Sequence, residues 1–456
     1  MSENKSEQFL DHIDLILGFK LLPELEHAAK RCLLDFLGAT FAGVNNFKSK
    51  LLACGDLLTD SDGSCTWIGF GRRVAPLNAS FLNGMAAHAV ELDDGVRFGM
   101  IHVGSPVFAA LLAAVENKKL NGEAFLRGVV AGYEAAVLLS STMQPDHYVK
   151  GFHPTATCGA VGAAIGVGVV SGYDRKQMKD TLSAVTIPAG GSLKIIEDDT
   201  ALKPANAGRA AMSGLLAAYQ AGAGFVGVDD PLAGRNGFIN MMCGDERSIN
   251  TSGSPSSAWI NQVYLKPFAA CRHSHAAIEA AQRIRSSDCV DVNQIRNVKI
   301  TTYSAVIGKH DHHEIRGAAA ARMSIPYGFA VAFVTGLAGV AQFQEPYIKD
   351  TEILSLTEKV VVCGDSELSA LVPGKRVAIV EVTLENGSRF SERVDYPLGE
   401  PENPISDKGL ENKFLELTCF AELSTEQAEQ IINAVWSLPA SMDRLYPLLA
   451  GQGVNI

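Results

Sequence analysis

A polar side chain beside a proline recurs along the sequence. The instances are His102 with Pro106, His153-Pro154, Lys203-Pro204 and Lys266-Pro267. Proline suits the first turn of a helix, and it keeps the residue before it out of the helical conformation. We therefore expect each of these side chains to lie beside the free N–H groups at the positive end of a helix.

The two lysines at these positions predict the binding of an anion. A lysine at the positive end of a helix is unfavourable unless an anion arrives to share both charges. Lys203 and Lys266 are therefore candidate clamps for a carboxylate or a phosphate, with Arg209 or Arg272 as a helper. The alternative that each Lys-Pro pair is a solvated loop stays open.

The two histidines are predicted to be neutral near pH 7. The same helix field that opposes a lysine lowers the pKa of an imidazole. A neutral His153 would suit proton abstraction from carbon. The alternative is a histidine that only packs in the core.

A second cluster combines carboxylates with histidines. The residues are His88, Glu91, Asp93 and Asp94, with His102 a short distance further on. His88 and Glu91 share a helix face at a spacing of three. Carboxylates close to histidines supply acid and base partners with different pKa values. A structural helix cap made by one of the aspartates is the alternative.

A third cluster, residues 309–314, is the densest group of metal-ligand types in the chain. Its histidines are His310, His312 and His313. Adjacent side chains point in different directions and no distant fourth ligand is evident, so we favour a surface segment. A metal-dependent hydrolase that uses these three histidines stays as an alternative.

The hydrophobic pattern predicts a mainly α protein. Apolar residues recur at helical spacing from Pro23 onward, and further helices are expected at 80–91, 106–117, 122–143, 155–171, 174–187 and 205–221. The many glycines are expected to allow close packing of helices. The uncharged stretch 155–173 is rich in Gly, Ala and Val, so we favour a buried central helix over a membrane span.

The composition changes after this region. Strands are expected at 298–303, 358–362, 376–384 and 390–396, with an Asn386-Gly387 turn closing a hairpin and helices at 273–285 and 318–337. Helices return at 406–420 and 424–437. We predict an all-α domain from residues 1–267 and 403–456, with a smaller α+β lid domain, residues 268–402, inserted between them.

The overall composition excludes several classes of protein. The 456 residues carry a net charge of −11, which argues against a nucleic-acid surface. The nine cysteines never form a Cys-x-x-Cys pair, and the N-terminus is polar where a signal peptide would be apolar. We expect a cytoplasmic protein with no membrane partner.

Several segments together resemble the MmgE/PrpD family, which includes 2-methylcitrate dehydratase, cis-aconitate decarboxylase and iminodisuccinate epimerase. They are AAHAVELDDG, HVGSPVFAALLAA, GFHPTATCGAVGAA, LKPANAGRAA, LKPFAACRHSHAAIEA, MSIPYGFAVA and PLGEPENPISDKGLENKF. The resemblance covers nearly the whole chain. It implies an all-α domain with an inserted α+β lid, a homodimer, and no metal or organic cofactor.

The resemblance also assigns residues to the family's pocket. Its histidines fall on His102 and His153, and its lysines on Lys203 and Lys266. In the decarboxylases an aspartate stands at Glu91, a threonine at Gly95 and a histidine at Cys271, whereas His275 is retained.

From these residues we expect a cofactor-independent lyase or isomerase that acts on a small di- or tricarboxylate. His153 would be the base and His102, tuned by Glu91 or Asp93, the acid. Substrate carboxylates would be bound by Lys203, Lys266, Arg272 and His275. Dehydration of the 2-methylcitrate type is the first choice, and epimerisation or decarboxylation is the alternative. A dimer that binds dicarboxylates without catalysis stays open.

Overall fold

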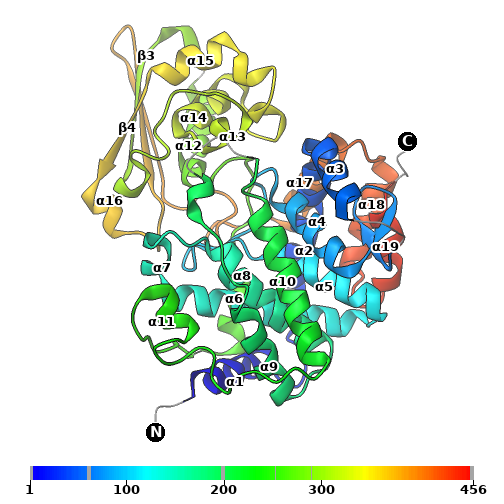
Figure 1. Cartoon of the computed structure of the whole chain (residues 1–456). Helices are drawn as coiled ribbons and strands as arrows, with labels where there is room; N and C mark the ends of the chain where they lie inside the picture. The colour runs from blue at the N-terminus through cyan, green and yellow to red at the C-terminus, as the bar shows by residue number, and fades with distance from the viewer. Residues whose placement is uncertain (1–3, 59–62, 197–200, 252, 289, 452–456) are drawn as a thin grey trace.

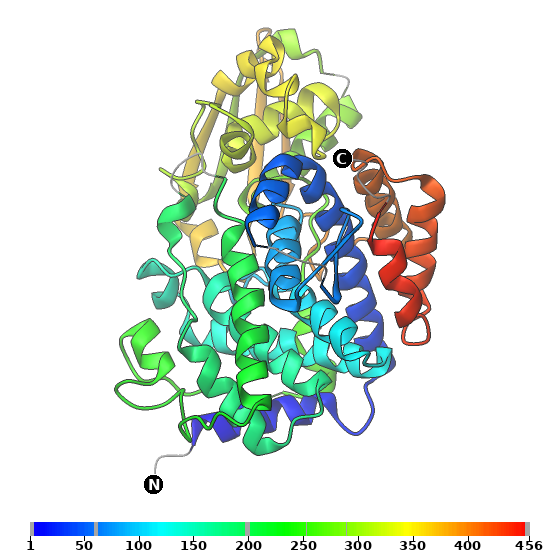
Figure 2. The same cartoon turned by 45° about the vertical axis from the view of Figure 1, so that its right-hand side comes forward.

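The computed structural model describes residues 4–58, 63–196, 201–251, 253–288 and 290–451, and these are mainly α-helical (Figures 1 and 2). Their buried apolar side chains form two clusters. One draws on residues 9–265 together with 405–449, and we call this part the helical region. The other draws mostly on residues 268–394, which we call the sheet region, and takes in a few side chains of the helical region such as Leu417.

The helical region surrounds an apolar central helix. Its elements are α1 (Lys5–Leu17), α2 (Pro23–Asn46), α3 (Lys48–Leu58), β1 (Cys65–Trp67), β2 (Arg72–Val74), α4 (Pro76–His88), α5 (Gly104–Lys118), α6 (Gly122–Met143), α7 (Asp146–Val149), α8 (Pro154–Val170), α9 (Arg175–Thr186), α10 (Ala205–Gly222) and α11 (Phe238–Cys243). Nearly every residue of α8 is buried. Our expectation of a buried helix here is therefore confirmed. Among the described helices, α6 alone is long and apolar enough to cross a membrane, and 83% of its apolar window is buried inside the protein.

Glycines let α6 and α8 cross at very short range. A Cβ atom on Gly162 would lie 2.5 Å from the carbonyl oxygen of Gly132 and 2.7 Å from Cβ of Ala136. One turn along, a Cβ on Gly166 would lie 2.7 Å from the carbonyl oxygen of Gly128. Only glycine permits this approach, so these residues fix how the two core helices pack.

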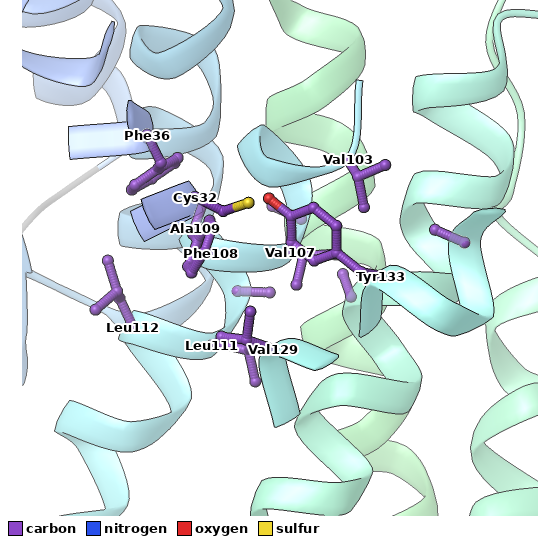
Figure 3. Packing of buried hydrophobic residues seen from close by; sticks show 14 of the residues in the cluster. Cys32, Phe36, Val103, Val107, Phe108, Ala109, Leu111, Leu112, Val129 and Tyr133 are labelled. Atoms are coloured by element: carbon purple, nitrogen blue, oxygen red, sulfur yellow. The ribbon is translucent and has the colours of Figure 1, made fainter. Parts of the chain in front are cut away.

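Tyr133 of α6 links the apolar core to a polar loop. Figure 3 shows its ring among core side chains that include Phe108 and Val107, with the hydroxyl on the same side as Cys32. The rings of Phe108 and Tyr133 meet edge to face, 5.9 Å apart. The Tyr133 hydroxyl donates a hydrogen bond to Asp94, in the loop that follows α4.

The sheet region carries a four-stranded sheet with helices packed against it (Figure 1). Its elements are α12 (His275–Asp288), β3 (Ile295–Tyr303), α13 (Ala318–Met323), α14 (Ile325–Thr335), α15 (Thr351–Glu358), β4 (Val360–Asp365), α16 (Ser366–Ala370), β5 (Ala378–Leu384) and β6 (Arg389–Val394). The strand order is β4-β3-β5-β6, in which β3 pairs in parallel with β4 and in antiparallel with β5. The predicted hairpin is confirmed, because β5 pairs with β6 and Gly387 takes the left-handed conformation at φ +87°.

Two sequence-based expectations about helices are wrong. The helix expected at 318–337 is interrupted at Ser324, which has an extended backbone and caps α14 by accepting the Tyr327 N–H with its side chain. No helix begins at Lys266-Pro267 either, since the next α-helix begins at His275. The helix α15 had not been expected.

The last helices pack beside α2 (Figure 2). They are α17 (Asp407–Phe420), α18 (Thr425–Trp436) and α19 (Met442–Leu449). The Lys413 ammonium of α17 donates to the buried Asp35 carboxylate of α2 at 2.6 Å, and it also donates to the carbonyl of Leu92 at 3.0 Å. The chain end therefore supports the loop after α4, where the polar cluster lies.

We predict that Gly162→Ala destabilises the protein by about 1–3 kcal/mol, because its methyl group overlaps the backbone of α6. The free energy of unfolding in denaturant measures this loss. Gly190→Ala is the control, since the nearest atom to a Cβ there is 3.9 Å away. Equal stability of the two variants would contradict the close crossing of α6 and α8.

Candidate active site

Glu91 lies between the two predicted lysines. Lys203, just before α10, ion-pairs with its carboxylate. Lys266 is fully buried, and its ammonium donates to the Glu91 carbonyl oxygen at 3.0 Å and lies 3.7 Å from Oε2. Burial raises the pKa of Glu91, but the charges of Lys203 and Lys266 outweigh it and hold that pKa far below its ordinary value. The structure thus joins both lysines through one carboxylate.

The backbone of Glu91 is strained. Its φ is +57°, a left-handed conformation that non-glycine residues rarely adopt. Such strain persists where surrounding contacts over-determine the position, which often happens at functional sites. Here the two lysines supply those contacts.

Three histidines gather beside this carboxylate. The ring of His88 lies 4.9 Å from that of His102 and 6.2 Å from that of His153, measured between centroids. His88 Nδ1 donates to Asp93 Oδ2 at 2.7 Å, and the Ser105 hydroxyl donates to the same oxygen at 2.8 Å. Burial raises the pKa of Asp93, but His88 and His102 outweigh it, so this pKa lies well below its ordinary value.

His102 and His153 are both neutral near pH 7. Burial, with the nearby charge of Lys266, lowers the pKa of His102 to about 3. Its Nδ1 donates to the carbonyl of Asp94 at 2.7 Å, which leaves Nε2 with the lone pair. Burial also lowers the pKa of His153 well below its ordinary value, with His88 and Lys203 adding to the effect. His153 Nδ1 is buried without a hydrogen-bond partner.

Asp94 has a different role from Asp93. Its Oδ1 accepts the N–H groups of Gly104 at 2.8 Å and Val103 at 3.2 Å, at the start of α5. Burial raises the pKa of Asp94 to about 7. The structural cap expected from the sequence is therefore Asp94, whereas the adjacent Asp93 contacts His88.

A cavity of about 530 Å³ opens between the helical region and the sheet region. Glu91 and Lys203 line it from the helical region, and Lys309, His312 and Arg322 line it from the sheet region. Lys266, His102 and His153 are not among its lining residues. Lys266 lies directly behind the cavity wall, because Glu91 borders the cavity and contacts Lys266.

Arg272 and His275 lie elsewhere. The Arg272 guanidinium pairs with the Glu400 carboxylate at 2.9 Å and hydrogen-bonds His275 Nδ1 at 2.7 Å, and both side chains are buried. His275 Nε2 lies 3.1 Å from the carbonyl oxygen of Ala270. Neither residue lines the cavity. The structure therefore does not bring these two residues to Lys203 and Glu91.

Tyr264 explains why position 95 is glycine. A Cβ atom on Gly95 would lie 2.4 Å from the Tyr264 hydroxyl oxygen, and the two residues pair through their backbones. The Tyr264 side chain thus fills the space that a larger residue at position 95 would need. The Arg272 guanidinium lies over the Tyr264 ring, 4.8 Å from its centroid.

The histidines of 309–314 do not converge on one point. His310, His312 and His313 each lie within hydrogen-bond distance of a different carbonyl, those of Met323, Ala320 and Val360. These three histidines therefore do not form the metal site that the sequence left open as an alternative. The surface segment that we favoured is only partly correct, because His310 is buried. Among the described residues, three ligand types do approach one another at Cys271, His273 and His310, and at His88, Asp93 and His102. The rings of His273 and His310 are stacked, with 4.8 Å between their centroids.

The site contains residues that the sequence argument did not assign. His88 precedes Glu91 by three residues, and this helical spacing is the signal that it lies on the same side as the site. Its Nε2 is buried without a hydrogen-bond partner. Arg322 follows four alanines and carries no sequence signal of its own.

Comparison with known proteins shows the family. The MmgE/PrpD N-terminal domain matches residues 18–249, and the MmgE/PrpD C-terminal domain matches residues 268–438. Together these matches span most of the chain, so the protein belongs to the MmgE/PrpD family.

Similar proteins are named as cis-aconitate decarboxylases or as decarboxylase-like. A cis-aconitate decarboxylase-like protein of Aspergillus oryzae is 27% identical, covering 93% of this chain and 92% of the relative. The cis-aconitate decarboxylase of Homo sapiens is 26% identical, covering 96% and 92%. That of Aspergillus terreus is 24% identical, covering 91% and 89%.

The depressed pKa of His102 predicts a pH effect on stability. Below pH 6.5 the unfolded chain binds a proton at this histidine that the folded chain rejects down to about pH 3, so stability is lost as the pH falls. We expect the wild type to lose about 2–3 kcal/mol more than His102→Gln between pH 7 and pH 4.5. Denaturant unfolding of both proteins at pH 7 and pH 4.5 measures this difference in stability loss. His27→Gln, at an exposed position, is the control, and an equal loss in wild type and His102→Gln would contradict the prediction.

Proposed function

We propose that this protein is a lyase or isomerase that abstracts a proton beside a carboxylate of a small di- or tricarboxylate without a metal or organic cofactor. The observation that carries the proposal is that two neutral histidines, the buried His153 and the partly buried His102, lie close to two lysines around Glu91. Neutral imidazoles accept protons, and ammonium groups stabilise the negative charge that develops on the substrate.

The lysines would act on the carboxylate of the substrate. Removal of a proton from the adjacent carbon moves negative charge onto the carboxylate oxygens, forming an enediolate. Lys203 lines the cavity and is the first contact for an incoming carboxylate. Lys266 lies deeper and holds the Glu91 segment in place through its carbonyl.

His153 is the proposed base and His102 the proposed acid. His153 takes the proton from carbon, and the electron pair of the broken C–H bond forms the new double bond as hydroxide leaves. His102 must first gain a proton at Nε2, and the negative charges of a bound substrate raise its pKa toward that state. It then delivers this proton to the hydroxide, which departs as water. Asp93 and Glu91 would tune this histidine, as Asp93 Oδ2 lies 3.7 Å from its ring.

Dehydration of the 2-methylcitrate type is our first choice for the second half of the reaction. The names of the relatives favour decarboxylation of cis-aconitate as a second candidate. That reaction breaks a carbon–carbon bond, releases CO₂ and returns a proton to carbon, and it would use the same lysines and the same acid. An epimerase would return the proton to the opposite face. The cytoplasmic location also remains a proposal.

Proton exchange in deuterated water tests the function. The protein is incubated with 2-methylcitrate, citrate, cis-aconitate and iminodisuccinate, after treatment with a chelator, and NMR detects deuterium on the carbon beside a carboxylate. We expect exchange or turnover with at least one acid. If none of the four exchanges or reacts, the proposed substrate class is wrong.

Two variants separate binding from chemistry on the acid that reacts. Lys203→Ala should raise KM roughly 10–100-fold, because one charged hydrogen bond is lost. His153→Ala should lower kcat roughly 100–10,000-fold. Lys176→Ala, an exposed lysine paired with Asp180 on α9, is the control. The opposite pattern, with kcat changed by the lysine and KM by the histidine, would overturn the roles.

We also propose a homodimer. Large apolar side chains stand exposed on the single chain, among them Phe19, Ile187, Phe225 and Val226, and burial in an interface would remove them from water. Sedimentation velocity should therefore give twice the chain mass of 48.5 kDa. A species of one chain mass at micromolar concentration would contradict the dimer.

A further inference from the structure

Arg322 is a buried cation at the wall of the cavity. It lies in the last turn of α13, and only 4% of its surface is exposed. Its backbone carbonyl accepts the N–H of Cys271 at 2.8 Å, which fixes the start of the side chain. Arg322 is among the residues that line the cavity from the sheet region.

One edge of this guanidinium has no partner. Nη1 donates to the carbonyl of Ala89 at 3.3 Å, whereas Nε and Nη2 are buried and make no hydrogen bond. No carboxylate of the described residues comes within ion-pair distance of Arg322. The Nε and Nη2 donors lie side by side on the guanidinium, and together they form the fork that matches the two oxygens of a carboxylate.

A buried arginine with two unpaired donors is expected to bind a ligand. Buried polar groups are nearly always hydrogen-bonded, and an unpaired buried charge is strongly unfavourable. Burial lowers the pKa of Arg322 to about 10, although Glu91 opposes this, so the side chain is still charged at neutral pH. The one hydrogen bond of the guanidinium is to the carbonyl of Ala89, which precedes Glu91 by two residues in the sequence.

We propose that the Nε and Nη2 edge of Arg322 binds a second carboxylate of the substrate as a bidentate pair. This inference rests on the proposed function, in which Lys203 receives the first carboxylate. The two anchors belong to different parts of the fold, since Lys203 precedes α10 of the helical region and Arg322 lies in the last turn of α13 of the sheet region. A substrate with two carboxylates binds across the cavity and uses both anchors, whereas a monocarboxylate uses one. Arg322 therefore selects di- and tricarboxylates.

Binding of unreactive acids tests the site directly. Isothermal titration uses propane-1,2,3-tricarboxylate and succinate as probes, with butyrate as the monocarboxylate. The variants are Arg322→Gln, which removes the charge, and Arg322→Lys, which keeps the charge but loses the fork. Arg316→Gln is the matched control, because Arg316 also lines the cavity but is exposed and pairs with Glu314.

We expect Arg322→Gln to weaken binding of the two polycarboxylates roughly 10–100-fold, and Arg322→Lys roughly 10-fold. Binding of butyrate should change less than 3-fold in either variant, and Arg316→Gln should bind all three probes as the wild type does. Without ligand, Arg322→Gln should unfold at the same temperature as the wild type or higher, because it removes an unpaired buried charge. A purely structural arginine would instead lower that temperature and leave the preference for polycarboxylates intact.

Several outcomes would overturn the inference. They are unchanged polycarboxylate binding in Arg322→Gln, an equal loss in Arg316→Gln, an equal loss for butyrate, and a wild type that binds none of the probes. If Arg322→Gln does not fold, Arg322→Lys carries the same comparison. A wild type that binds polycarboxylates through Arg322 but exchanges no deuterium with any acid would overturn the proposed function and leave the arginine site standing.

Discussion

The buried ammonium of Lys266 is the constraint on which the site depends. A fully buried charge needs nearby anions and hydrogen-bond acceptors. Lys266 finds them in one short loop, with the Glu91 carbonyl at 3.0 Å, the Glu91 carboxylate at 3.7 Å and the Asp93 carboxylate at 3.9 Å. These contacts oppose the left-handed strain at Glu91 and place its carboxylate against Lys203. Asp93 in turn orients His88, so a single cation sets the arrangement of the lysines, carboxylates and histidines.

Adjacent residues in the loop after α4 make different contacts. Asp93 faces the histidines, Asp94 turns away to cap α5 and to accept the Tyr133 hydroxyl, and Gly95 makes room for Tyr264. Tyr133 also belongs to the apolar core (Figure 3). The loop is therefore hydrogen-bonded to a core side chain of α6. The close glycine crossing of α6 and α8 supports the site indirectly, because α8 begins at Pro154 and so positions His153 at its first turn.

The sequence predicts local features of this site better than long-range ones. Helix ends at His153-Pro154 and the hairpin at Asn386-Gly387 follow from backbone preferences of proline and glycine, and both predictions agree with the structure. The helix expected after Lys266-Pro267 is absent, because the proline preference permits a helix and does not require one. Arg272 is close to Lys266 in the chain, which predicts that it helps Lys266 to bind an anion. Its guanidinium instead donates to the carboxylate of Glu400, 128 residues away. Pairings of this kind depend on tertiary contacts, which no local spacing encodes.

The charge of the cavity differs in sign from that of the whole chain. The sequence carries a net charge of −11, yet among the described residues the cavity is lined by five cationic side chains, Lys50, Lys203, Lys309, Arg316 and Arg322, and by two acidic ones, Glu91 and Glu314. A local positive field inside a low-dielectric wall concentrates small anions, whereas the acidic remainder repels them from the outer surface. Glu91 reduces this field at Lys203 and Lys266, because its carboxylate lies close to both side chains. An incoming carboxylate then competes with Glu91 for Lys203, and a substrate with only one carboxylate gains little from that exchange. In the proposed function, additional anchoring elsewhere in the cavity makes this exchange favourable, so that substrates with several negative charges bind better.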